Sequence, residues 1–140
     1  CWKLFGRAPS IPPLVGAGSR LGARQGVIMA TDGGSVAVDS NTLEWRETPS
    51  AGVQWKKLHF DRERGDSAVL LKFEPGASYA AHEHPAGEEY LILEGTLEDG
   101  GRTYGAGTFV RHAPGSVHVP RSQDGCIVYV RLAEPIREVS

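Results

Sequence analysis

Cysteines and long apolar runs are scarce in this 140-residue chain, and each scarcity excludes a class of protein. The two cysteines, Cys1 and Cys126, lie far apart and form no C-x-x-C pair, which argues against a disulfide framework and a zinc finger. This cysteine usage favours a reducing, cytoplasmic compartment. No run approaches the roughly 18 apolar residues that a membrane helix needs, so we expect no membrane partner.

Acidic residues are absent from the start of the chain. Residues 1–28 hold four basic residues and no acid, so residues 29–140 carry 17 acidic against 11 basic residues, a charge of −6. That body has no basic stripe, and we expect no nucleic-acid partner.

Three interpretations of the residues before Met29 stay open: a flexible leader, an organelle transit peptide, or sequence upstream of the true start. We predict a leader over residues 1–34, a single domain over 35–135 and a C-terminal tail over 136–140.

Helical periodicity is also missing, whereas short runs rich in β-formers are frequent. The 18 glycines and 9 prolines separate runs such as SAVLLKFE and CIVYVRL. In the first run Val69, Leu71 and Phe73 share one face of an extended strand. Short alternating runs at regular spacing predict an all-β fold, an antiparallel sandwich or barrel. The run SVAVDS near residue 35 reads as its first strand.

Two histidines and a carboxylate stand close together in AHEHPAGEEYLILEG, residues 81–95. His82 and His84 are two residues apart, so a strand projects both to the same side. A turn then leads to Glu88 at the start of the next strand, which Gly95 is predicted to end at a tight turn. Imidazoles with a carboxylate suit Zn, Fe(II), Mn, Ni or Co. Taken alone, an H-x-H pair in a β-protein is more often a surface or core feature than a metal site, and the following glutamate changes this balance only modestly.

A further histidine follows the Pro114-Gly115 turn. A lone histidine at position 118 would normally be structural. Its separation from the first cluster is, however, the separation that a jelly roll uses to return a fourth ligand across a barrel. Sequence patterns for a serine, cysteine or nucleotide-dependent catalytic site are missing, so any reaction would rely on a metal ion.

Together these segments resemble the cupin family. Gly76, His82, His84, Glu88 and Gly95 have the spacing of the first cupin motif. The segment from Gly107 to Ser122 resembles the second motif, with Ala113 and Ser122 at positions where that motif has proline and asparagine. The phrases HEHPAGEEYLILEG and YGAGTFVRHAPGSVH are most similar to the ChrR-like group. The resemblance covers roughly residues 53–132.

The resemblance implies a double-stranded β-helix, a jelly-roll barrel, with one divalent metal ion in it. Carried over residue by residue, the implied ligands are His82, His84, Glu88 and His118. Cupin spacing also tolerates Glu89 as the ligand, but the distance to Gly95 and the strand parity favour Glu88. Zinc is the first expectation for the metal, with Fe(II), Mn and Ni as alternatives.

For function, the resemblance implies a stand-alone ChrR-like cupin with a small-molecule ligand or a sensory role. The alternative is an Fe(II)-dependent dioxygenase that cleaves a small diketone or hydroxyaryl ketone. ChrR anti-sigma factors grip their sigma factor through a helical zinc domain, and residues 1–52 contain no H-x-x-x-C-x-x-C pattern. We therefore expect no sigma-factor partner. We expect a homodimer that pairs through the strands containing Trp45 and Trp55.

Other polar and apolar side chains are candidates for the pocket beside the metal. Strand parity places Tyr90 and Ile92 on the same face as Glu88. Regular alternation also requires either Arg111 or His112 to face the barrel, and Arg111 could hold an anionic substrate. Cys126 is expected in the core and His59 in solvent.

Overall fold

A computed structural model of the chain describes residues 34–139. The predicted leader therefore lies outside the described residues except for its last position. The elements are the 3-10 turn η1 (Ser40–Thr42) and strands β1 (Arg46–Glu47), β2 (Val53–Phe60), β3 (Ser67–Phe73), β4 (His82–His84), β5 (Glu88–Asp99), β6 (Arg102–Gly105), β7 (Phe109–His112), β8 (Ser116–His118), β9 (Cys126–Leu132) and β10 (Arg137–Glu138). The predicted all-β class is confirmed. Residues 35–40, expected as a strand, instead lead into η1, where the Asp39 side chain accepts a hydrogen bond from Asn41 N (2.9 Å).

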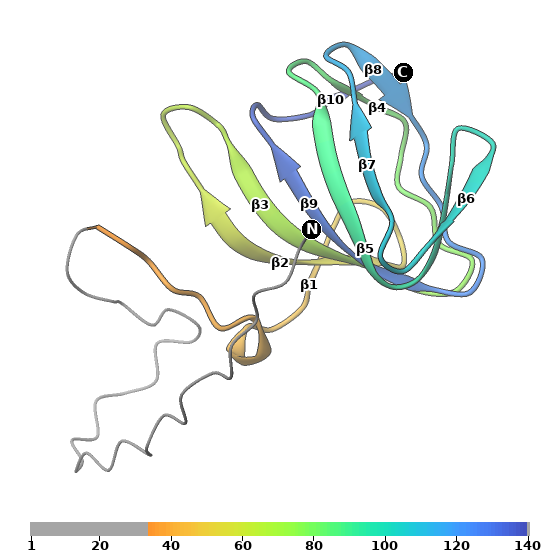
Figure 1. Cartoon of the computed structure of the whole chain (residues 1–140), viewed down its shortest axis with the longest axis horizontal. Helices are drawn as coiled ribbons and strands as arrows, with labels where there is room; N and C mark the ends of the chain where they lie inside the picture. The colour runs from red at the N-terminus through yellow and green to blue at the C-terminus, as the bar shows by residue number, and fades with distance from the viewer. Residues whose placement is uncertain (1–33, 140) are drawn as a thin grey trace, which may run out of the picture.

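The strands form two antiparallel sheets. The larger sheet has the order β1-β2-β3-β9-β5-β6, with β7 also paired to β5, and the smaller has the order β10-β4-β8. In Figure 1 the larger sheet curves, and β4, β8 and β10 lie together at one end of the barrel. The tail predicted for residues 136–140 includes β10, which pairs with β4 through Arg137↔Glu83 and Glu138↔His82. The barrel thus extends beyond the predicted boundary at residue 135.

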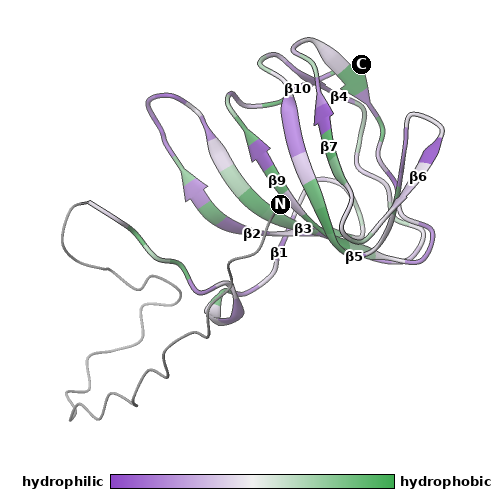
Figure 2. Cartoon of the chain, viewed as in Figure 1, coloured by the Kyte–Doolittle hydropathy of each residue, from purple (hydrophilic) through white to green (hydrophobic). Residues whose placement is uncertain are grey.

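The apolar core lies on the inner face of the larger sheet. Figure 2 shows β5 beginning hydrophilic and becoming hydrophobic along its length, as the sequence EEYLIL dictates. The alternation predicted for β3 and β9 is confirmed. In β9 the buried residues recur every second position, and in β3 the buried Val69 and Phe73 line the cavity side together with the half-buried Leu71 between them. The buried apolar residues are Val53, Val69, Phe73, Tyr90, Ile92, Leu97, Cys126, Val128 and Val130.

Gly95 does not end a strand, contrary to the sequence-based prediction. β5 continues through it to Asp99, with a register shift against β9 between Ile92 and Glu94. The glycine has a φ of 72°, and a Cβ at this position would overlap the carbonyl oxygen of Gly125. Close approach of two backbones therefore requires glycine here, and the strand bends instead of turning.

The bulge in β5 also changes which residues face inward. Before it, the buried positions are even-numbered, and after it they are Leu97 and Asp99. A polar residue thus enters the barrel where unbroken alternation would have placed it outside.

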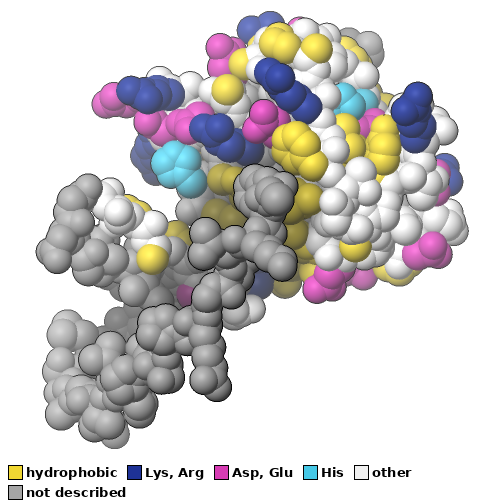
Figure 3. Space-filling view, in the orientation of Figure 1, with side chains coloured by type: hydrophobic (Ala, Val, Ile, Leu, Met, Phe, Trp, Pro, Cys, Tyr) yellow, Lys and Arg dark blue, Asp and Glu magenta, His cyan; other side chains and the backbone are white. Residues whose placement is uncertain are grey.

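The surface carries charges of both signs. In Figure 3 they gather over the hairpin that joins β2 and β3 and are mixed with hydrophobic side chains elsewhere on the face shown. Among residues 34–139, no helix is long and apolar enough to cross a membrane.

Candidate metal centre

Four side chains from three strands converge inside the barrel. His82 and His84 come from β4, Glu88 begins β5 and His118 ends β8, opposite His82 in the antiparallel register. All four are buried, with exposures of 5%, 0%, 7% and 9% in chain order. The structure thus brings together the four residues that the resemblance implied as ligands. Glu89, the alternative to Glu88, lies nearer the surface and faces Arg111 (3.7 Å).

The turn between β4 and β5 sets the position of Glu88. Its last residue, Gly87, has a φ of 85°, and a Cβ there would come within 2.7 Å of the carbonyl oxygen of His112. Its N–H donates to the carbonyl oxygen of His84 (3.1 Å). The chain therefore reverses tightly enough to bring Glu88 Oε1 within 3.5 Å of His84 Nε2.

The donor atoms have spacings that suit one metal ion. His118 Nε2 lies 3.1 Å from His82 Nε2 and 3.6 Å from Glu88 Oε2. Two donors about 2.1 Å from the same ion lie about 3.0 Å apart at a right angle and about 3.4 Å apart at the tetrahedral angle. The observed spacings span both geometries, so they are compatible with one divalent ion and do not select its coordination number.

Hydrogen bonds on the far side of the rings set the tautomers. His82 Nδ1 donates to the carbonyl oxygen of Ala80 (2.7 Å), and His118 Nδ1 donates to Asp99 Oδ2 (3.0 Å). Because a carbonyl and a carboxylate only accept, both Nδ1 atoms carry a proton, and Nε2 is the atom through which each ring in its neutral form can bind a metal. His84 Nδ1 lies 3.2 Å from the Ser116 hydroxyl. Such outer contacts orient metal-binding imidazoles.

Asp99 is the centre of a buried hydrogen-bond network that sequence reasoning missed. Its Oδ2 accepts from Tyr90 OH (2.8 Å), His112 Nε2 (2.8 Å) and His118 Nδ1 (3.0 Å). The carboxylate is 4% exposed. Burial alone would raise the pKa of Asp99, but the hydrogen bonds, led by that from His118, hold the pKa well below its ordinary value. An anion is therefore fixed directly behind one candidate ligand.

Burial dominates the pKa values of His82, His84 and Glu88. It lowers the pKa of His84 to about 3 and also lowers the pKa of His82, with the neighbouring imidazoles acting in the same direction. It raises the pKa of Glu88 to about 7, and His118 acts in the opposite direction. The two histidines are therefore neutral, the form in which imidazole binds metals.

Two buried atoms of the cluster lack hydrogen-bond partners, namely His84 Nε2 and Glu88 Oε2. Leaving such atoms unpaired is costly, and a cation placed between them would satisfy both. The residues therefore fit a divalent metal ion. Three imidazoles and one carboxylate suit several first-row metals, and this donor set does not fix which one.

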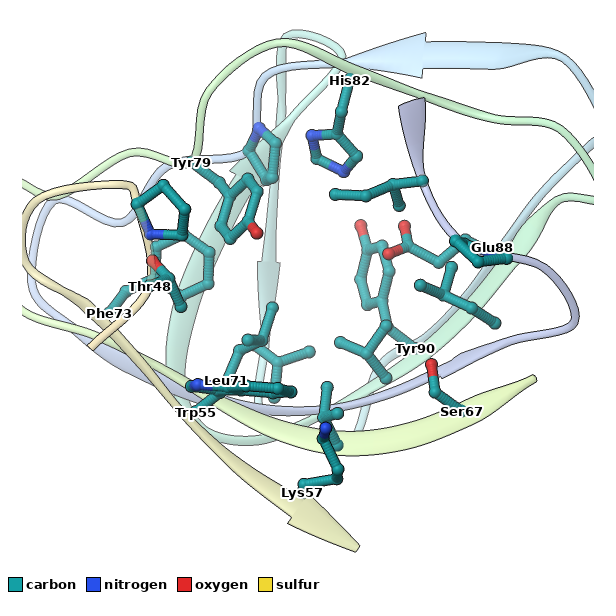
Figure 4. A pocket seen from close by; sticks show the side chains of 18 of the residues that line it. Thr48, Trp55, Lys57, Ser67, Leu71, Phe73, Tyr79, His82, Glu88 and Tyr90 are labelled. Atoms are coloured by element: carbon teal, nitrogen blue, oxygen red, sulfur yellow. The ribbon is translucent and has the colours of Figure 1, made fainter. Parts of the chain in front are cut away.

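A cavity of about 420 Å³ adjoins the cluster. His82, Glu88 and His118 form part of its wall, and most of the remaining wall is apolar. Figure 4 shows His82 at one end of this space, with Tyr90 and Glu88 on one side and Phe73 and Tyr79 on the other. The size and the apolar lining are typical of a site for a small organic molecule.

The three sequence-based pocket candidates have different positions. Tyr90 lines the cavity, whereas Ile92 is fully buried in the core. Arg111 does not face the barrel, because its side chain is 74% exposed. The residue of this strand that faces inward is His112, which binds Asp99. Trp55 also lines the cavity, and its expected place in a dimer surface stays a prediction.

Two other expectations concern residues away from the cavity. Cys126 is buried in the core, as predicted, and its burial raises the pKa of the thiol. The His59 side chain is 59% exposed and lies 3.6 Å from Asp66, outside the four candidate ligands and the Asp99 network.

Solved structures of other proteins share this fold. A candidate acetylacetone dioxygenase from Methylibium petroleiphilum is 22% identical with a TM-score of 0.72, covering 81% of this chain and 86% of its own. The acetylacetone dioxygenase from Acinetobacter johnsonii is 21% identical with a TM-score of 0.68, covering 80% and 81%. Similarity at this level shows the fold alone.

The anti-sigma factor ChrR, solved with SigE from Rhodobacter sphaeroides, is 25% identical with a TM-score of 0.58. The match covers 67% of this chain and 50% of ChrR. No curated protein is significantly similar to the chain. The family model described as the ChrR cupin-like domain matches residues 34–134. The barrel and the histidine motifs agree with that family match. The chain therefore belongs to the ChrR cupin-like domain family.

Proposed function

We propose that this protein binds one divalent first-row metal ion through His82, His84, Glu88 and His118, and a small, mostly apolar organic molecule beside it. One observation carries the proposal: three of these four side chains also form the wall of the cavity. A purely structural metal site is closed by its ligands. Here the cluster borders a space that a ligand can enter.

The protein side chains have distinct roles in such a site. The apolar wall excludes water and holds the body of the ligand, while the Tyr90 hydroxyl remains protonated and donates to Asp99. Burial, followed by the hydrogen bond to Asp99, raises the pKa of Tyr90. The Asp99 carboxylate also orients the His118 ring. A bound divalent ion would supply Lewis acidity and, in the case of iron, redox chemistry with dioxygen.

A second candidate function is Fe(II)-dependent dioxygenation of a small β-diketone or hydroxyaryl ketone. The apolar cavity beside an oxygen- and nitrogen-donor cluster favours it. Two structures that share this fold over about four fifths of both chains are named for acetylacetone dioxygenase activity, and they suggest which reaction class to test. A sensory role would need the same binding site without turnover.

Elemental analysis of freshly purified protein tests the metal site. We expect close to one equivalent of a first-row metal in the wild type and its loss in His118→Ala. The matched control is His59→Ala, because the His59 side chain is 59% exposed and lies outside the four candidate ligands and the Asp99 network. Equal metal content in wild type and His118→Ala, or none after reconstitution with Zn(II), Fe(II) and Mn(II), would refute the proposed site.

Oxygen uptake tests the enzymatic alternative separately. The protein is reconstituted anaerobically with Fe(II) and mixed with pentane-2,4-dione or 2-hydroxyacetophenone in oxygenated buffer. The dioxygenase hypothesis expects substrate-dependent uptake that His84→Ala abolishes. Absence of uptake with iron bound would exclude this reaction for both substrates and leave the binding function standing.

A further inference from the structure

The cavity has a cationic residue far from the metal centre. Among the described residues that line it, Lys57 of β2 is the only lysine or arginine. In the register of the larger sheet Lys57 pairs with Val69, Val69 with Val130, and Val130 with Tyr90. Lys57 and Tyr90 therefore stand in one row, three strand spacings apart, which is about 14 Å along the curved sheet. Figure 4 shows Lys57 on the side of the cavity opposite His82.

Two aromatic rings hold the ammonium group of Lys57. Its Nζ lies 4.6 Å from the centroid of the Trp55 ring and 4.7 Å from that of Phe60. Ring faces attract the cation but accept no conventional hydrogen bond, so the three N–H donors stay available. The ion pairs formed among residues 34–139 do not include Lys57.

The lysine lies where the cavity meets solvent. Lys57 and Phe60 are exposed, whereas the candidate metal ligands at the other end are buried. The carboxylate of Glu47, which also lines the cavity, accepts a hydrogen bond from the Gln54 amide. The space is therefore apolar in its middle, has metal-binding groups at its closed end and has a cation at its open end.

We propose that Lys57 binds a carboxylate on the ligand of this cavity. The proposal rests on the proposed function and narrows its substrate class. The ligand has an apolar body, a ketone or hydroxyl oxygen that reaches the metal centre, and a carboxylate at its opposite end. A single ammonium group matches one carboxylate, whereas a phosphate dianion would need more donors than this wall offers. Neutral diketones would use only the metal end.

A matched pair of probes tests this assignment. 4-Acetylbenzoate and 4-acetylbenzamide have the same shape and the same ketone, and only the first is anionic. Their affinities for the Zn(II)-loaded full chain are measured by calorimetry at low and high salt. We expect the carboxylate to bind about fivefold to tenfold more tightly at low salt, and salt to reduce this preference.

Variants at two lysines complete the experiment. Lys57→Met keeps the apolar stem and should abolish the carboxylate preference and its salt dependence, with unchanged affinity for the amide. That unchanged affinity would also show that Lys57→Met folds. If Lys57→Met does not fold, Lys57→Gln is used in its place. The control Lys72→Met removes a lysine of the adjacent strand β3 that pairs with Glu74 (2.9 Å) and does not line the cavity. It should behave as the wild type.

The outcomes separate the two proposals. Equal binding of both probes, or a carboxylate preference that survives in Lys57→Met, overturns the role of Lys57 while the metal-dependent binding site stands. If neither probe binds the metal-loaded protein, the proposed ligand class and the binding function both fail. Binding of the amide that persists after the metal is removed would leave the cavity as a ligand site independent of the metal.

Discussion

Replacing Asp99 with asparagine should weaken metal binding without removing a candidate ligand. Asp99 Oδ2 accepts three hydrogen bonds, and one of them fixes the Nδ1 proton of His118. The substitution keeps the volume and removes the charge. Hydrogen bonds to a charged group contribute about 1.5–3 kcal/mol, and neutral ones about 0.5–1.5 kcal/mol. The bond to His118 should therefore weaken by about 1–1.5 kcal/mol.

That loss corresponds to roughly a tenfold decrease in metal affinity, because about 1.4 kcal/mol changes an equilibrium constant tenfold. It lies at the lower end of the roughly 10- to 100-fold range seen when partners behind metal-bound histidines are mutated. The lower end is reasonable here, since the asparagine carbonyl oxygen can still accept from one of the three donors. Because Asp99 is buried, water cannot enter to compensate for the weakened hydrogen bonds.

The assay is competition for Zn(II) between the full chain and a fluorescent chelator of known affinity. Asp124→Asn is the control, because Asp124 is an exposed aspartate outside the cluster. Urea unfolding of the metal-free proteins separates an effect on the site from a general loss of stability. If Asp99→Asn binds Zn(II) within twofold of the wild type while His118→Ala does not bind, the carboxylate does not orient the ligand and the reasoning is wrong.

Three further expectations follow from other parts of the barrel. Gly95→Ala should lower the free energy of unfolding in urea by about 2–4 kcal/mol, because the added Cβ would overlap the Gly125 carbonyl oxygen. Gly107→Ala, with open space around the added Cβ, should lower it by only about 1–2 kcal/mol. With the other cysteine replaced by serine, native Cys126 should react with a thiol reagent at pH 8 far more slowly than the unfolded chain, because burial raises its pKa and leaves less thiolate at that pH; equal rates would contradict this. Arg111→Ala should leave ligand affinity in calorimetry within twofold of the wild type, since its side chain is 74% exposed. The thermal midpoint of each variant is compared with that of the metal-loaded wild type. Free metal at 100 times its dissociation constant should stabilise the folded wild type by about 2.7 kcal/mol.

The strands and their faces could be predicted because alternation is a local property. Val69 and Phe73 are buried on the face that period two predicts, and His82 and His84 share a side for the same reason. The turn before Glu88 is also local, as its glycine shows. The candidate ligands needed only these short-range patterns together with the recurrent spacing of two motifs.

Asp99 and His112 could not be found in the same way. Counting alternate positions from Glu88 places Asp99 on the outer face, and only the bulge after Ile92 brings it inside. The bulge arises where β5 meets β9, a contact between segments far apart in the sequence. For β7, alternation left Arg111 and His112 as equal choices, and the pairing of His112 with Glu88 decides between them.

The two ends of the cavity are linked by the same kind of long-range register. Lys57 and Tyr90 share a row only because β3 and β9 lie between their strands, so no motif in the sequence connects them. The metal end is built from closely spaced motif residues, whereas the open end depends on β2, at the far side of the sheet. A change of residue at position 57 would therefore alter which molecule is bound while the ligand set stays intact. Under the two proposals, different strands supply the two ends of the cavity, so selectivity would vary independently of the metal.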